Sequence, residues 1–112
     1  MPVGWDEHER GVARLRDSYA ALPPDAPVRL AKRTSNLFRG RDRQAAGLDV
    51  SGLAGVIEVD DQVAEVQGMC TYEDLVDATL AHGRIPLVVP QLRTITLGGA
   101  VTGLGIESTS FR

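Results

Sequence analysis

A cluster of glycines near the end of the sequence constrains this chain more than any other feature. Gly98, Gly99, Gly103 and Gly105 fall within eight residues. Glycine weakens a regular helix or strand by about 0.5–1 kcal/mol relative to alanine, so such a cluster requires a reason. One reason is close approach of the backbone to a ligand, with amide N–H groups free to bind phosphate or a ring edge. The alternative is a tightly packed loop without room for larger side chains, and glycine count alone leaves both open.

Two common phosphate-binding motifs are absent from this segment. No Lys-Ser or Lys-Thr pair follows the glycines, which excludes a Walker P-loop. The dinucleotide-binding pattern Gly-x-Gly-x-x-Gly is also missing, because Gly103 and Gly105 are followed by Ser108 where the third glycine would stand. A phosphate ligand at this segment would need a different arrangement of donors.

Hydrophobic spacing in the first part of the chain predicts a helix and then a strand. Apolar residues recur every three or four positions over about 6–22, which predicts a helix with one buried stripe. The expected stripe is Val12, Leu15, Tyr19 and Leu22. Pro23 and Pro24 end this helix. Alternation of apolar and polar residues over 28–32 predicts a short, half-buried strand.

The middle of the chain predicts a hairpin and a second helix. Two short apolar runs, 56–59 and 63–66, flank the polar turn 60–62, as in a β-hairpin. Thr71 stands three residues before Asp74, which predicts the N-cap of a helix over 71–82 that ends at Gly83. The buried stripe expected for this helix is Leu75, Val76, Thr79 and Leu80. The apolar run 85–89 then predicts another short strand.

Composition excludes several classes of function. The net charge of −3 disfavours a general binder of nucleic acid or of acidic membranes, since both need a basic excess. The sequence contains no run of about 18 apolar residues, so no membrane span is predicted. The polar, acidic start of the chain is unlike a secretory signal. The single cysteine, Cys70, rules out a disulfide within the chain and is most simply a small buried hydrophobe, without a metal site. We therefore expect a cytoplasmic protein.

The glycine-rich segment and the residues before it resemble a known family. The stretch from Pro90 to Ser108 is similar to the succession of proline, Thr-x-Gly-Gly and Gly-x-Gly in FAD-linked oxidases of the vanillyl-alcohol-oxidase type. The strand pair 53–60 and 63–68 and the helix 71–82 resemble the family's elements that precede it. Among these enzymes, delta-24 sterol reductases carry a similar glycine pair followed by Gly-x-Gly-Ile-Glu-Ser. The resemblance covers about 48–112.

This resemblance implies an α+β fold that forms part of a PCMH-type FAD-binding domain. Residues 1–112 would be its N-terminal part, the small subdomain plus the start of the second subdomain. Within it, 1–47 would supply a helix, a strand and a basic loop, and 48–112 the hairpin, the helix and the flavin segment. Catalytic groups of relatives lie mostly in later parts of the domain and in a cap domain. No catalytic residue is therefore assigned in this chain.

The resemblance also implies which residues contact the cofactor. In the family the glycine-rich segment lies along the flavin and the pyrophosphate. The candidate FAD contacts carried over to this sequence are Thr96, Leu97, Gly98, Gly99, Gly103, Gly105, Ile106, Glu107 and Ser108. We expect FAD to be bound non-covalently, because covalent members often use a histidine in an earlier loop, where His8 and His82 do not lie. Both histidines are expected at the surface.

A basic loop supplies the remaining candidate contacts. Six of the chain's twelve basic residues fall between Arg29 and Arg43. Many relatives bind the pyrophosphate on a loop after a strand, and the matching position here is the glycine-free segment Arg33, Thr34, Ser35 and Asn36. Its hydroxyl and amide groups and the Arg33 charge would bind phosphate oxygens. The alternative is a solvated basic loop.

The function implied is that of the FAD-binding portion of a flavin-dependent oxidoreductase. The activity expected of the parent protein is sterol-reductase-like reduction of a double bond. The alternatives are an aldonolactone or glycolate-type oxidase, and a non-catalytic fragment that binds no cofactor and associates with itself. Expected partners are FAD and either the remainder of the parent chain or a second copy, and we expect the 112 residues alone to be inactive.

Overall fold

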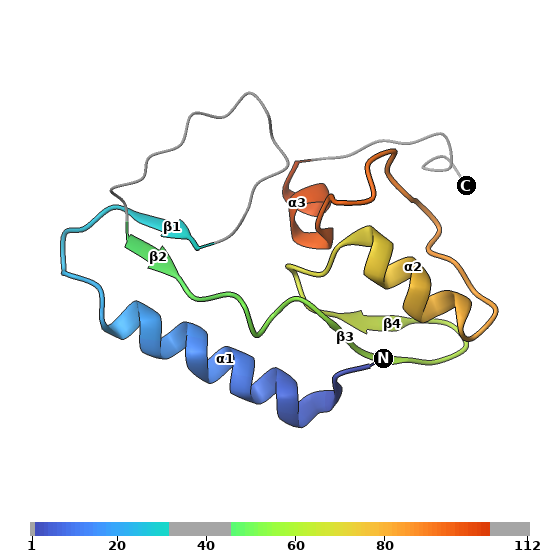
Figure 1. Cartoon of the computed structure of the whole chain (residues 1–112), viewed down its shortest axis with the longest axis horizontal. Coiled ribbons are helices and arrows are strands. Elements are labelled where there is room, and N and C mark those ends of the chain that lie inside the picture. The colour runs from blue at the N-terminus through green and yellow to red at the C-terminus, as the bar shows by residue number, and fades with distance from the viewer. Residues whose placement is uncertain (1, 32–45, 104–112) are drawn as a thin grey trace.

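The computed structural model describes residues 2–31 and 46–103 (Figure 1). These residues form a mixed fold of helices and strands. Its elements, in chain order, are α1 (Gly4–Ala20), β1 (Val28–Leu30), β2 (Ala46–Leu48), β3 (Val56–Val59), β4 (Ala64–Val66), α2 (Tyr72–Leu80) and α3 (Leu97–Thr102). Within these ranges no helix is both long enough and apolar enough to cross a membrane.

The strands form two separate sheets. β1 pairs in parallel with β2, with Val28 opposite Ala46 and Leu30 opposite Leu48. Contrary to the prediction of a half-buried strand, every residue of β1 is exposed. Val28 and Leu30 are two positions apart and therefore share one face of the strand. No other described element covers that face, so the predicted burial of the apolar residues was wrong.

The hairpin predicted from the two apolar runs is confirmed. β3 and β4 are antiparallel, with an irregularity in register between Val56 and Glu58. Their turn is held by the carboxylate of Asp60, which accepts hydrogen bonds from the N–H groups of Gln62 (2.7 Å) and Val63 (2.8 Å). These two bonds lower the pKa of Asp60, because they stabilise the charged carboxylate.

The second helix and its cap are also confirmed. The Thr71 hydroxyl oxygen accepts a hydrogen bond from the Asp74 N–H at 3.2 Å. α2 packs on the hairpin, and the core between them contains Val56, Cys70, Tyr72 and Leu75. The helix buries Thr79 but leaves Leu80 54% exposed, so the predicted stripe was wrong at Leu80. Leu80 is the last residue of α2 and lies about 100° around the helix from Thr79, away from the hairpin.

α1 lies where the first helix was predicted but contacts the rest of the protein differently. Val12, Leu15 and Leu22 are half-buried, whereas Tyr19 is 65% exposed, so its predicted burial was wrong. The buried residue of the helix is Gly11. A Cβ atom at Gly11 would collide with the carbonyl of Gly52, so the helix approaches the 51–55 segment through backbone. Tyr19 lies eight residues further along α1, more than two turns from this contact.

The strand predicted over 85–89 does not form. The chain between Gly83 and Leu92 is irregular, and Leu87 is 87% exposed. Pro86 and Pro90 have no N–H to donate to a neighbouring strand, which disfavours pairing at both positions. Gly83, with φ +70°, ends the turn after α2 in a backbone conformation that side chains other than glycine rarely adopt.

Candidate functional site

The first part of the glycine-rich segment forms a short helix, α3, which the sequence did not predict. The Thr96 hydroxyl oxygen accepts a hydrogen bond from the Gly99 N–H at 3.1 Å and so caps the helix. The Thr102 hydroxyl donates back to the Gly98 carbonyl at 2.9 Å. A helix of six residues with two glycines has neither a hydrophobic period nor a favourable propensity, so nothing local indicated it.

α3 is held against the connection between β4 and α2 by backbone hydrogen bonds (Figure 1). The Gly98 N–H donates to the Gly68 carbonyl and the Leu97 N–H to the Cys70 carbonyl, each at 2.8 Å. Just before the helix, the Tyr72 N–H donates to the Ile95 carbonyl at 3.0 Å. The start of α3 is therefore fixed to the core of the hairpin and α2.

The two adjacent glycines of α3 have different surroundings. A Cβ atom at Gly98 would lie 2.8 Å from the Gly68 carbonyl oxygen, which is backbone and cannot move aside cheaply. Gly99 is exposed, and a Cβ atom there would meet only the Thr96 hydroxyl, at 2.9 Å. Packing against backbone within the protein therefore accounts for Gly98, whereas Gly99 makes no such backbone contact with the other described residues.

The hydrogen bonds at the start of α3 limit which ligand groups this helix could bind. The N–H groups of Leu97, Gly98 and Gly99 all donate to acceptors of the protein itself, so they offer no anion-binding site for pyrophosphate. The exposed backbone at Gly99 and the proton of the Thr96 hydroxyl stay available.

The remaining candidate contacts are only partly described. Gly103 follows α3 as its C-cap, so Thr96, Leu97, Gly98, Gly99 and Gly103 are brought together on this one short helix and its ends. The segment Arg33–Asn36 and the residues Gly105–Ser108 lie outside the described residues.

Gln67 is a residue that the sequence analysis missed. Its side chain is 4% exposed and bonds to the 52–55 segment and to His8 of α1. His8 is consequently half-buried, which differs from the surface position predicted for it, whereas His82 is exposed as predicted. A polar glutamine within the predicted strand pair was a signal that its side chain has a specific partner. Its hydrogen-bond partners lie 12 to 59 residues away, so the sequence did not indicate them.

Cys70 is completely buried beside the Gly68–Gly98 contact. Burial raises the pKa of the Cys70 thiol to about 11, and the carboxylate of Asp74 adds to the rise. The thiol therefore stays protonated at neutral pH and is a poor nucleophile. Within residues 2–31 and 46–103 no group of His, Cys, Asp and Glu side chains is arranged to hold a metal ion.

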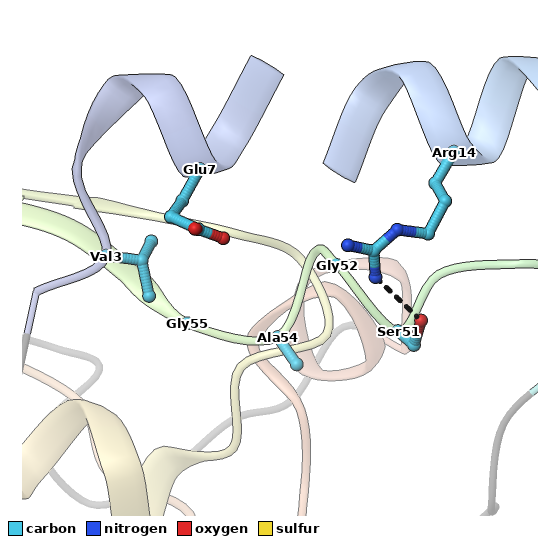
Figure 2. Close-up of a pocket in the computed structure, with 7 residues that line it drawn as sticks. All are labelled: Val3, Glu7, Arg14, Ser51, Gly52, Ala54 and Gly55. Atoms are coloured by element: carbon cyan, nitrogen blue, oxygen red, sulfur yellow. Dashed lines mark hydrogen bonds between the residues drawn. The ribbon is translucent and has the colours of Figure 1, made fainter. Parts of the chain in front are cut away.

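A shallow cavity of about 280 Å³ lies between α1 and the 51–55 segment (Figure 2). Its charged groups have partners within the protein: Arg14 donates to the Ser51 hydroxyl at 3.4 Å and Glu7 pairs with Arg10 at 2.6 Å. The pairing with Arg10 lowers the pKa of Glu7. The cavity is lined by Val3, Glu7, Arg14, Ser51, Gly52, Ala54 and Gly55, none of which is a candidate FAD contact.

Comparison with known proteins gives one family. A sequence model described as FAD binding domain matches residues 15–112, a range that begins within α1 and includes every candidate FAD contact. No curated protein and no solved structure matches the chain significantly. Since the match covers most of the sequence, the chain belongs to the FAD binding domain family.

Proposed function

We propose that α3 contacts the isoalloxazine or ribityl part of FAD and that the segment 33–36 binds its pyrophosphate. The proposal rests on the family match over 15–112, together with the exposed backbone at Gly99. The division of roles follows from the hydrogen bonds, because the N–H groups at the start of α3 already have acceptors. Arg33 has the charge and the planar donors that phosphate oxygens favour.

The whole protein that carries this chain is proposed to be a flavin-dependent oxidoreductase. FAD supplies hydride transfer when bound, while the protein orients it and sets its electrostatic surroundings. The sterol-reductase-like activity rests on the glycine pair of α3 followed by Gly105-Ile-Glu-Ser108. NADPH-dependent reduction of a sterol double bond by that protein would support this class. Oxygen-dependent oxidation of an aldonolactone or of glycolate would favour the alternative.

Arg33 provides the test of the pyrophosphate segment. A charge-assisted contact is worth about 1.5–3 kcal/mol, so Arg33→Ala should weaken FAD binding roughly 10- to 150-fold. The matched control is Arg41→Ala in the same basic region, which should leave FAD affinity close to that of the wild type. Fluorescence titration of FAD measures both. Equal effects at the two positions, or no effect at either, would favour the alternative that 33–36 is a solvated basic loop.

Non-covalent binding is the second part of the proposal. The proposal is supported by the sequence, because the segment 33–36 contains no histidine and the chain's two histidines, His8 and His82, lie elsewhere. Acid precipitation of the FAD-loaded protein should leave the flavin in the supernatant. Flavin that stays in the protein pellet would contradict this.

The domain description and the location in the cell also remain proposals. We assign 1–112 to the N-terminal part of a PCMH-type domain, the small subdomain plus the start of the second. Within it, 1–47 supplies a helix, a strand and a basic loop, and 48–112 supplies the hairpin, the helix and the glycine-rich flavin segment. A cytoplasmic location is supported by the single, buried and unpaired Cys70. Fractionation of cells that express the whole protein would test the location.

Self-association without cofactor is a second candidate function. Ile85, Leu87 and Leu92 are exposed in the irregular segment after α2, which makes this segment a candidate for burial by a partner. In this reading a second copy of the chain, or the remainder of its parent chain, covers that segment. Sedimentation equilibrium with a flavin absorbance scan on the same sample decides between the readings. A monomer carrying one FAD would eliminate self-association.

A further inference from the structure

One side of α3 is turned towards the core of the protein. The side chains of Leu97 and Ala100 pack against the core cluster between the hairpin and α2. The N–H groups of Leu97 and Gly98 donate to backbone carbonyls of the connection between β4 and α2, at 2.8 Å each. These contacts fix how the helix is rotated about its own axis, and so they fix which of its residues face away from the core.

The outer face of α3 consists of Gly99, Thr102 and Gly103. A helix advances by about 100° per residue, so Thr102 lies about 60° and Gly103 about 40° around the axis from Gly99. Leu97 lies about 160° from Gly99, on the inner side. All three residues of the outer face are exposed within the part of the chain that the structure describes. Because the other two are glycines, Thr102 supplies the side-chain atoms of this face.

The hydroxyl group of Thr102 is turned back onto the helix. It donates to the Gly98 carbonyl oxygen at 2.9 Å and also lies 3.3 Å from the Gly99 carbonyl oxygen. A hydroxyl group has a single proton to donate, and both of these acceptors belong to the preceding turn of α3. That proton is therefore already used within the helix, and the methyl group is the part of the side chain left for contact with a ligand.

From this geometry we infer that Thr102 contacts the isoalloxazine or ribityl part of FAD and that its methyl group, rather than its hydroxyl group, makes the contact. The inference rests on the proposed function, because that function assigns α3 to FAD. It adds a residue to the contacts that the family resemblance implies. Its consequence is that FAD affinity depends on the shape of the side chain at position 102 and is insensitive to the loss of the hydroxyl group.

The first test compares two adjacent positions of α3 in the whole protein that carries this chain. Thr102→Leu adds bulk to the outer face and should weaken FAD binding roughly 5- to 150-fold, the affinity equivalent of typical overpacking. The matched control is Val101→Leu, because Val101 is 66% exposed but lies about 160° around the helix from Gly99. This control should bind FAD nearly as tightly as wild type. Fluorescence titration of FAD measures both variants.

The second test separates the methyl group from the hydroxyl group. Thr102→Val keeps the branched shape and removes the hydroxyl group, so FAD affinity should stay close to that of wild type. Thr102→Ser keeps the hydroxyl group and removes the methyl group, so FAD binding should weaken about 4-fold, the affinity equivalent of one buried methyl group. Urea unfolding of the FAD-free variants should show that both remain folded, because Thr102 is exposed.

A readout that does not need FAD separates this inference from the proposed function. Vicinal NMR couplings to the Thr102 methyl carbon in the FAD-free protein should report one side-chain rotamer, the one that bonds to the Gly98 carbonyl. If wild type shows this rotamer but binds no FAD, the proposed function fails, and the contact role of Thr102 fails with it. If wild type binds FAD and every variant at position 102 binds it as tightly, this inference alone fails.

Three further results would overturn the inference. Equal losses of affinity in Thr102→Leu and Val101→Leu would mean that FAD does not lie on the outer face of α3. Weakened binding by Thr102→Val, with normal binding by Thr102→Ser, would assign the contact to the hydroxyl group. Couplings averaged over several rotamers would contradict the hydrogen bond to Gly98. If Thr102→Leu does not fold, the comparison of Thr102→Val with Thr102→Ser decides the question.

Discussion

Two pairs of glycines bring backbone against backbone in this protein, at opposite ends of the chain. Gly11 of α1 meets Gly52, and Gly98 of α3 meets Gly68. The second contact includes a direct hydrogen bond of 2.8 Å and adjoins the completely buried Cys70, whereas no hydrogen bond joins the first pair. A family motif contains Gly98, yet the structure explains that glycine by packing. A glycine that a resemblance assigns to cofactor binding can therefore serve the fold, while its neighbour Gly99 is exposed.

The stronger contact predicts the largest effect of a substitution. Gly98→Val places a branched side chain against the Gly68 backbone, whose carbonyl oxygen would lie 2.8 Å from the new Cβ atom. We expect a loss of about 3 kcal/mol in the free energy of unfolding, at the upper end of typical overpacking. Urea unfolding measures it. A loss below about 1 kcal/mol would show that the backbone at Gly68 moves to accommodate the valine side chain at little cost in free energy.

Gly11→Ala should have a smaller effect than Gly98→Val. The new Cβ would collide with the Gly52 carbonyl, but alanine is favoured over glycine in a helix by about 1 kcal/mol, which offsets part of the cost. Without a hydrogen bond across the pair, α1 can also shift. We expect a net loss of about 1–2 kcal/mol in urea unfolding. A gain in stability would mean that α1 does not lie against Gly52 in solution.

The cap of α3 should matter still less. Thr96→Ala removes the acceptor for the Gly99 N–H and should cost about 1 kcal/mol, the usual value for a helix N-cap. Thr71→Ala removes the equivalent cap of α2 and serves as the reference. Thermal unfolding of the two variants compares them directly. An unchanged melting temperature for Thr96→Ala, with a lowered one for Thr71→Ala, would indicate that α3 is not helical in solution.

The smallest effect at neutral pH concerns Cys70. Its pKa in the folded protein is raised from 9.0 to about 11, so the folded state holds the proton more tightly than the unfolded state. The resulting contribution to stability is complete below about pH 9 and is lost as the pH rises towards about 11. Cys70→Ala should lack this part of the alkaline loss, measured by urea unfolding across that range. The same alkaline loss in both proteins would place the thiol outside the core.

The parts of the fold that sequence could predict are those with local causes. The hairpin and the capped helix α2 follow from residues a few positions apart, and both are confirmed. The parallel pairing of β1 with β2 joins segments on either side of 32–45, where no local pattern specifies a partner. The run 85–89 has strand-like composition, but Pro86 and Pro90 and the lack of a described neighbour leave it irregular.

The candidate site shows the same limit. The glycine motif marked the segment around Thr96, Gly98 and Gly99 as the candidate site, but it did not predict that this segment forms the helix α3. It did not distinguish Gly98 from Gly99, since only the position of Gly68 in space separates their roles. Gln67 and His8 lie 59 residues apart, and their contact depends on how α1 packs.

The central claim is that the exposed face of α3 at Gly99 contacts FAD. The most direct test measures FAD binding by equilibrium dialysis and unfolding by urea for Gly99→Val in the whole protein. Among the described residues, a Cβ atom at Gly99 meets only the Thr96 hydroxyl, so the protein should stay folded, with a stability change near the roughly 1 kcal/mol of a lost cap. FAD retention should be abolished, because the valine occupies the ligand's space. FAD bound at wild-type affinity by a folded Gly99→Val protein would contradict the account.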